Sequence, residues 1–340
     1  MAIFICPTCK KIWGYKIEKC PYCFESLKRE KCKNVKVKFI NQTTIPSIFH
    51  QKVPYYVLVL EDENKRKFLQ KSTKLYQANE PFELEKSQNK NKAVAIWRKK
   101  YDFFEPIEKI FEIFDIVLKP DQKILILPTI KSPNHPHSRE NTSPEFLEGI
   151  FDFLLESGLK AENITIMNQS FDNVSLIEKL KKSQILTVCE RKKINVFDIS
   201  QGEFLEKEGI KITKKIFETD FILNAPILNM KKAEATENLF SLIEKENLKV
   251  LEYFSEKNEI FKKLEPHLPQ IFTLAEANQV QNENGVNFYL NLVLGSFNPK
   301  NLDAVFYKIV KRKIPEIIKD VEIEKIEIVG RKIEEVETFL

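Results

Sequence analysis

Apolar and polar residues alternate in two different ways along the chain. Residues 35–40 and 67–70 mix apolar side chains with lysine and glutamine, and residues 55–60 read Tyr-Tyr-Val-Leu-Val-Leu. Alternation with a period of two, and runs of aromatic or β-branched residues, are typical of strands. We therefore expect strands in all three segments. Residues 85–92 are entirely polar, which indicates a linker.

Beyond this linker, strand-like segments alternate with segments of helical spacing. Residues 106–118 carry apolar side chains at intervals of three and four, and Ser143 before Pro144 has the features of a helix start. We expect strands at residues 93–97, 123–130, 164–167, 194–199, 221–223, 271–274, 288–294 and 321–329. We expect helices at residues 106–118, 143–158, 173–183, 233–263 (in one or two pieces) and 299–312. Strands separated by helices predict an α/β fold with a doubly wound, mainly parallel sheet.

Four of the six cysteines form two Cys-x-x-Cys pairs, Cys6 with Cys9 and Cys20 with Cys23. Each pair can point two thiolates at one centre, and two pairs complete a tetrahedral Zn²⁺ site with no open position for water. We therefore expect a structural zinc site, with iron bound by the same four sulfurs as the alternative. The other two, Cys32 and Cys189, are too few to ligate an iron–sulfur cluster.

Charge is distributed unevenly between the two ends of the chain. Residues 1–100 hold 22 Lys and Arg against 9 Asp and Glu, whereas residues 101–340 hold 32 against 40. Aromatic residues, Phe39 and Tyr55 among them, lie between the lysines of the basic part. This composition suits single-stranded nucleic acid, with lysines 65, 67, 71 and 74 as contacts. A phosphate-bearing small molecule, docking onto the acidic part, or a merely solvated lysine surface are the alternatives.

Composition excludes some classes of protein. The 8 glycines form no G-x-G and no P-loop pattern, which excludes a Gly-rich-loop nucleotide site. No apolar run approaches the roughly 20 residues that cross a bilayer, and no signal-peptide pattern precedes Cys6. Paired cysteines in such a chain favour metal binding over disulfides. The expected location is cytoplasmic, with no membrane partner.

Polar residues follow several expected strands, and the carboxyl ends of parallel strands are where α/β sheets bind ligands. The loop after residues 123–130 holds two of the four histidines, whereas His50 and His267 stand alone in expected loops. Candidate catalytic residues are Lys131, His135, His137 and Asp303. Candidate substrate-binding residues are Arg139, Asn224, Asn238 and Asn298. The competing interpretation is an exposed histidine loop, together with Asn and Asp residues that only cap helices.

The basic part resembles a known module. The segment Cys6–Cys23, the strand around Phe39, and residues 46–54 leading into 56–60 resemble the rubredoxin-like zinc ribbon plus OB-fold found with acyl-CoA-handling thiolases and hydratases. The resemblance covers residues 1–85. It implies an accessory module that helps to hold acyl-CoA or an active enzyme assembly, with a thiolase-like enzyme as partner.

Residues 91–330 resemble a second family. The blocks FEIFDIVLKPDQKILILPTIKSP, TDFILNAPIL, ENLFSLI, NLVLGSFNPKNLDAVFYKI and KIEIVG match, in order, the family called domain of unknown function 362. The resemblance implies an α/β domain distantly similar to that of the nickel-pincer lactate racemase. Many members add ferredoxin-type clusters, whose cysteines this chain lacks. The family usually carries Lys, Asn or Asp, or a Lys-rich run, at several positions where this chain has a different residue. These positions are Leu127, Thr129, Ile227, Asn229, Lys231, Glu237 and Asn298. The Asp at position 303 is kept.

These observations predict a zinc ribbon at residues 1–34, an OB-like β-barrel at 35–86 and an α/β domain at 91–340. Three functions are open. The first is an enzyme, or a relative of enzymes, that acts on a small anionic or acyl-thioester metabolite at the sheet edge. The second is a non-catalytic accessory subunit of an acyl-CoA-handling assembly. The third is nucleic-acid binding through the basic part.

Overall fold

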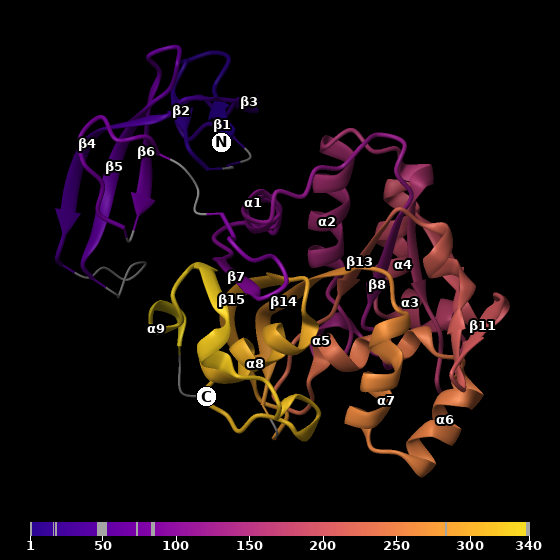
Figure 1. Cartoon of the computed structure of the whole chain (residues 1–340). Helices are drawn as coiled ribbons and strands as arrows, with labels where there is room; N and C mark the ends of the chain where they lie inside the picture. Colours follow the sequence, from indigo (N-terminus) through magenta and orange to yellow (C-terminus); the bar gives the residue numbers. More distant parts are fainter. Residues whose placement is uncertain are drawn as a thin grey trace. The chain divides into compact units, whose positions relative to one another are not determined.

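The computed structural model describes residues 2–15, 17, 19–45, 53–72, 74–82, 86–282 and 284–337. The chain divides into two compact units, residues 1–85 and residues 86–340. This division falls at the start of the polar segment 85–92. Each unit has its own β-sheets (Figure 1).

The first unit contains two antiparallel three-stranded sheets. One has the order β2-β1-β3 and the other the order β4-β5-β6. Their bounds are β1 (Ala2–Ile5), β2 (Ile12–Trp13), β3 (Lys28–Lys31), β4 (Lys36–Thr43), β5 (Tyr55–Glu61) and β6 (Lys67–Ser72). The strands expected at residues 35–40, 55–60 and 67–70 are present. The zinc-ribbon and OB-barrel assignments stay predictions.

A small apolar core joins these two sheets. Ile3 from β1 is fully buried together with Val37, Leu58 and Leu60. The alternation on β5 explains this arrangement, because Leu58 and Leu60 point inward while Val57 and Val59 point to the other face. So few buried side chains stabilise a unit of this size only modestly, and a bound metal would add to that stability.

The second unit is built on an eight-stranded sheet with the order β10-β9-β8-β13-β14-β15-β7-β16 (Figure 1). In chain order its strands are β7 (Ala93–Arg98), β8 (Ile124–Pro128), β9 (Ile164–Asn168), β10 (Asn195–Asp198), β13 (Phe221–Ala225), β14 (Ile271–Gln281), β15 (Asn287–Ser296) and β16 (Glu327–Gly330). The α/β class expected from the sequence is confirmed. The sheet is mixed, however, because β15 runs antiparallel to both β14 and β7.

The antiparallel part of the sheet follows from the length of one connection. β14 and β15 are separated by only residues 282–286, too short a segment for the crossover that parallel neighbours require. Gly285 lies there with a φ of +80°, a conformation that glycine adopts without strain. From β10 to β14 every neighbouring pair is parallel, as is the pair β7 and β16.

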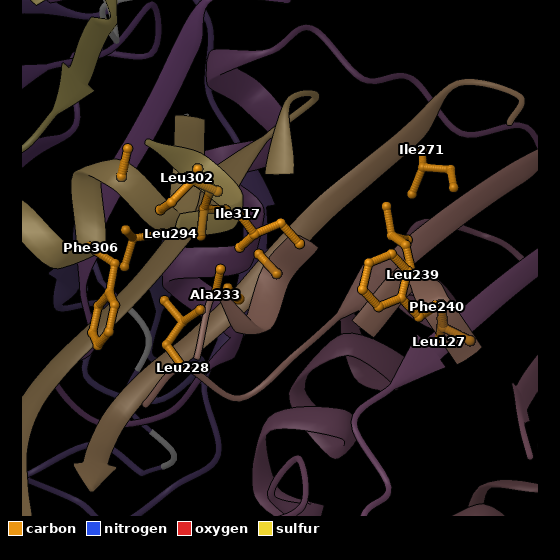
Figure 2. Close-up of a cluster of buried hydrophobic side chains, with 14 of the residues drawn as sticks. Leu127, Leu228, Ala233, Leu239, Phe240, Ile271, Leu294, Leu302, Phe306 and Ile317 are labelled. Atoms are coloured by element: carbon orange, nitrogen blue, oxygen red, sulfur yellow. The ribbon is translucent and has the colours of Figure 1, made fainter. Parts of the chain in front are cut away.

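Helices cover both faces of this sheet. The α-helices are α1 (Phe104–Ile113), α2 (Pro144–Glu156), α3 (Leu176–Lys182), α4 (Ile185–Lys192), α5 (Glu234–Glu237), α6 (Lys245–Phe254), α7 (Lys257–Leu264), α8 (Pro299–Ile309) and α9 (Ile333–Val336). On one face α1 packs so closely on β15 that a Cβ added to Gly295 would lie 2.3 Å from Cγ2 of Ile110. On the other face, Leu302 and Phe306 of α8 belong to the same buried cluster as Leu294 of β15 (Figure 2).

The structure differs locally from the sequence-based expectations, for example in helix α4 (Ile185–Lys192), which was not expected. Residues 233–263 form α5, a 3₁₀ turn η5 (Asn238–Leu242), α6 and α7 rather than one or two helices. Of the strand expected at 321–329, only β16 is formed. The hairpin β11 (Phe204–Lys207) and β12 (Ile210–Thr213) was not expected. Within the described residues, no helix has both the length and the apolar character needed to span a bilayer.

Candidate functional site

The four paired cysteines of the first unit come together. The sulfur atoms of Cys6, Cys9, Cys20 and Cys23 all lie within 4.8 Å of one another. Sγ of Cys6 is 3.2 Å from Sγ of Cys23, and Sγ of Cys9 is 3.5 Å from Sγ of Cys20. In a tetrahedral site with Zn–S bonds of about 2.3 Å, sulfurs are about 3.8 Å apart. The spacing therefore fits one metal ion held by four thiolates.

Two matching backbone turns produce this arrangement. The N–H of Lys10 donates to the carbonyl of Cys6, and the N–H of Phe24 donates to the carbonyl of Cys20. Lys10 and Phe24 both have left-handed φ values, 61° and 58°. Each turn thus reverses the chain directly after the second cysteine of its pair. The repeated geometry explains why the two pairs face one another.

The thiols of this cluster already differ in acidity. Burial raises the pKa of Cys6, but hydrogen bonds from the backbone of Cys9 and the thiol of Cys23 outweigh it and lower that pKa to about 6. The hydrogen bond with Cys6, together with burial, raises the pKa of Cys23 to about 12. The thiolate is the form of cysteine that binds a metal, so an ion entering this cluster would displace the thiol protons. These residues can hold a metal ion.

The second unit has a cleft of about 490 Å³ at the carboxyl ends of β8, β9 and β13. Thr129 directly follows β8, and Asn168 is the last residue of β9. Charged lining residues come from the loops after β8 and β9, from α3, from the segment after β13 and from α6 and α7. They are Lys131, Asp172, Lys179, Lys232, Glu234, Glu237, Lys249, Glu252 and Lys257.

A buried carboxylate forms one wall of this cleft. Nζ of Lys131 lies 2.5 Å from each carboxylate oxygen of Glu234, and Nδ2 of Asn229 donates to Oε1 of Glu234 at 2.5 Å. Glu234 is almost fully buried, and its burial raises its pKa, while the charge of Lys131 acts in the opposite direction. The pair places an ammonium and a carboxylate side by side in the cleft lining.

A buried lysine from α3 reaches the same cleft. Only 1% of the side chain of Lys179 is exposed. Its Nζ donates to the carbonyl of Lys131 at 2.9 Å and lies 2.9 Å from Oδ2 of Asp172. The hydrogen bond with Lys179 lowers the pKa of Asp172 to about 2. An ammonium group has three N–H donors, so two acceptors within the described part of the chain leave one donor for a ligand.

Two of the candidate asparagines form hydrogen bonds that join the segments around the cleft. Nδ2 of Asn238 donates to the carbonyl of Leu127 at 2.9 Å and to Oδ1 of Asn224 at 2.8 Å, and Oδ1 of Asn238 accepts from Thr129. Asn224 in turn donates to the carbonyl of Ala235. Asn238 lines the cleft and Asn224 does not. Their hydrogen-bonding groups are therefore largely used in joining the segment after β13 to the sheet.

Asp303 of α8 lies beneath α5 and does not line the cleft. It is fully buried, and its carboxylate accepts hydrogen bonds from the backbone N–H groups of Ala235 and Thr236 and from the Thr236 hydroxyl. Burial raises the pKa of Asp303 to about 8. The geometry gives this residue the role of holding the start of α5, the helix that carries Glu234.

The histidine loop lies apart from the cleft lining. The rings of His135 and His137 are 4.7 Å apart and exposed, and Nε2 of His135 lies 3.1 Å from the amide nitrogen of Gln184. Arg139 adopts a left-handed φ of 54° at the end of this loop. Asn298 caps α8 by accepting from the N–H of Asn301. Of the candidates named from the sequence, only Lys131 and Asn238 line the cleft.

Asn168, Glu234 and Lys179 are among the cleft residues that were not foreseen. Asn168 directly follows the expected strand 164–167, so the rule that sites lie at strand ends could have found it. Glu234 is the first acidic residue after β13 and stands at a helix start, where it looks like an ordinary first-turn acid. Lys179 lies in the lysine-rich segment 178–182, and nothing in that pattern distinguishes a buried lysine from an exposed one.

The cleft and the strands β8, β9, β10, β13, β14 and β15 lie within a stretch that matches a known family. Residues 124–308, which are 185 of the 340 residues, match the family described as domain of unknown function (DUF362). The chain belongs to the DUF362 family. Every residue that lines the cleft falls inside the DUF362 match, whereas the four clustered cysteines lie outside it. No curated protein matches the chain.

Of the positions at which the sequence analysis expects this chain to depart from the DUF362 pattern, Thr129 and Glu237 line the cleft. Thr129, in place of Asn, donates to Asn238 at the floor of the cleft. Glu237, in place of Lys, lines the cleft and pairs with Lys257 of α7. The lysine supplied by α7 therefore offsets the negative charge that Glu237 brings to the cleft.

Proposed function

We propose that the DUF362 region binds a small anionic metabolite in the cleft at the carboxyl ends of β8, β9 and β13. The observation that carries this proposal is Lys179, a buried ammonium that lines the cleft and keeps one N–H donor after satisfying Lys131 and Asp172. A desolvated cation with a donor in reserve favours an anion strongly, because water screens the charge less inside a cleft.

The remaining charges of the cleft support an anionic ligand. Each of three carboxylates pairs with its own lysine, Asp172 with Lys179, Glu234 with Lys131 and Glu237 with Lys257. Lys232 has no acceptor among the residues that the structure describes. Counting Glu252 and Lys249 as well, five lysines and four carboxylates line the cleft, so the lining carries one net positive charge. The cleft volume, about 490 Å³, lies within the range of small-molecule sites.

The pair of Lys131 and Glu234 extends the proposal from binding to chemistry. A buried carboxylate whose pKa burial raises can accept or return a proton, and the ammonium beside it stabilises the charged form. In this proposal the region acts as an enzyme, or a relative of enzymes, on a carboxylate, phosphate or acyl-thioester metabolite. The four-cysteine centre then has a structural role in the first unit, with zinc as the expected ion and iron as the alternative.

The test compares two lysines of one helix. Lys179→Met removes the cleft ammonium, whereas Lys182→Met removes an exposed ammonium of α3 that pairs with Glu178. Isothermal titration of the full chain with inorganic phosphate, a four-carbon dicarboxylate and acetyl-CoA measures binding to each variant. We expect at least one of these anions to bind the unchanged chain and the Lys182→Met variant, and to bind Lys179→Met at least tenfold more weakly.

Two results would overturn the proposal. One is that none of the three anions binds the unchanged chain at millimolar concentration. The other is that Lys179→Met, shown by circular dichroism to be folded, binds the same anion as tightly as Lys182→Met does. An anion that binds both variants equally does not depend on the ammonium of Lys179 in the cleft.

A further inference from the structure

The outer face of the sheet β4-β5-β6 carries a row of apolar side chains. Phe39 of β4 is directly opposite Val59 of β5, and Val59 is directly opposite Leu69 of β6. Residues opposite one another in neighbouring strands point to the same face. Phe39 is 66% exposed and Leu69 is 57% exposed. The opposite face of the same strands holds the buried Leu58, Leu60 and Phe68.

Lysines lie on both sides of this row along the strands. On one side, Lys36 and Lys67 lie in register with Glu61, and Lys38 stands at the bulge between Val37 and Phe39. On the other side, Lys71 lies in register with Val57. Glu61 pairs with Lys38 at 3.3 Å, so it cancels one positive charge of the four. The face is therefore an apolar centre with an excess of positive charge around it.

We propose that this face, formed by Phe39, Val59 and Leu69 with Lys36, Lys38, Lys67 and Lys71, binds single-stranded nucleic acid. The proposal goes beyond the anion cleft, which lies in the other unit and uses other residues. An exposed ring at the centre of a flat sheet can stack on an unpaired base. Lysines on both sides of the ring can contact the phosphates that flank that base.

The arrangement favours unpaired bases over a duplex. In a duplex the base faces are stacked on one another, so a flat sheet would meet only phosphates and Phe39 would contribute little. An acidic protein would use the lysines but would not require an aromatic ring at the centre. The contribution of Phe39 therefore separates the three kinds of partner. Of the lysines singled out from the sequence, Lys67 and Lys71 lie on β6, whereas Lys65 lies in the turn before it and Lys74 after it.

The test measures fluorescence anisotropy of a labelled twelve-nucleotide oligothymidine with the full chain. Phe39→Ala is compared with Tyr253→Ala, which removes an exposed ring from α6 of the other unit. We expect Phe39→Ala to weaken binding about 5- to 150-fold, the range for loss of one stacked base, and Tyr253→Ala to leave it unchanged. Metal content and thermal midpoint of each variant show that the first unit is folded.

Salt dependence tests the lysines separately. Each phosphate contact to a single strand contributes a slope of about −0.7 in log affinity against log salt concentration. Lys67→Gln with Lys71→Gln should reduce the slope by about 1.4, whereas Lys181→Gln with Lys182→Gln on α3 should not change it. Binding that is absent at 50 mM salt, equal for a duplex of the same length, or unaffected by Phe39→Ala would overturn the proposal. Equal competition by poly-glutamate would overturn it too.

Discussion

The carboxylate of Asp303 accepts two hydrogen bonds from Thr236, one from the backbone N–H at 2.8 Å and one from the hydroxyl at 2.7 Å. A third comes from the N–H of Ala235 at 3.0 Å. The first N–H groups of a helix have no partner within the helix, and here α8 supplies one for α5. Asp303 therefore joins α8 to the start of α5, the helix whose Glu234 lines the cleft.

Asp303→Ala should destabilise the second unit. The substitution leaves three buried donors without an acceptor, and each unsatisfied donor costs about 1–3 kcal/mol, so we expect a loss of about 3 kcal/mol or more. Urea unfolding followed by circular dichroism measures this loss. Asp121→Ala is a suitable control, because Asp121 is an exposed acid in the turn before β8. A loss no greater than that of Asp121→Ala would contradict the role assigned to Asp303.

The stability contributed by Asp303 should fall as the pH rises. Its pKa is about 8 in the folded chain and about 3.9 in an unfolded chain. Between these values the folded state binds more protons than the unfolded state, so the free energy of unfolding decreases with increasing pH. The stabilising contribution of Asp303 is fully present below about pH 4. Above that pH, the free energy of unfolding decreases by at most about 1.4 kcal/mol per pH unit.

Asp303→Asn isolates this effect, because it removes the titration and keeps the shape. The difference in unfolding free energy between the unchanged chain and the variant should be larger at pH 5 than at pH 7.5. Burial also raises the pKa of the buried Glu234 and Glu276, but these groups remain in both proteins and cancel in the difference. A difference that stays constant or grows with pH would show that Asp303 titrates normally.

Removal of the metal should unfold the first unit and spare the second. The core of the first unit is small, and structural zinc sites contribute on the order of 10 kcal/mol. Proteolysis after treatment with a strong chelator should therefore cleave within residues 1–85 and leave a resistant fragment that begins near residue 86. Cys20→Ser should behave like the chelated protein, whereas Cys189→Ser, a buried cysteine of α4, should retain one metal ion per chain. Metal analysis of the purified protein identifies the ion.

Local sequence patterns predicted most strands of the second unit and little of its central helical segment. The strands are continuous apolar runs bounded by polar turns, and that signal is local. Residues 233–263 also have helical spacing, but long-range contacts divide them. The backbone around Asn238 bends so that this side chain reaches the carbonyl of Leu127, and Ile243 pairs with Ile212 of the hairpin. Contacts between residues that far apart leave no trace in local periodicity.

The two candidate sites also differ in how far the sequence predicted them. The four cysteines were found because the spacing within each pair fixes the geometry of metal ligands. The edge that holds the cleft followed from a rule about parallel sheets, but the side chains there depend on tertiary structure. His135 and His137 have the reactive chemistry and lie outside the cleft lining, whereas Lys179 comes from a segment that reads as an ordinary charged helix. Lys179 is significant because it is buried, and the residue type alone does not determine whether a lysine is buried.

The place of β7 in the sheet has a consequence for how the domain is made. This strand, residues 93–98, is paired on one side with β15 and on the other with β16, residues 327–330. Both β7 and β16 lie outside the 124–308 match. A fragment trimmed to that match would leave the backbone hydrogen-bonding groups of β15 that normally pair with β7 exposed. Such an unpaired strand edge promotes aggregation. During synthesis, the border of β7 that pairs with β16 stays unpaired until residues 327–330 have been made.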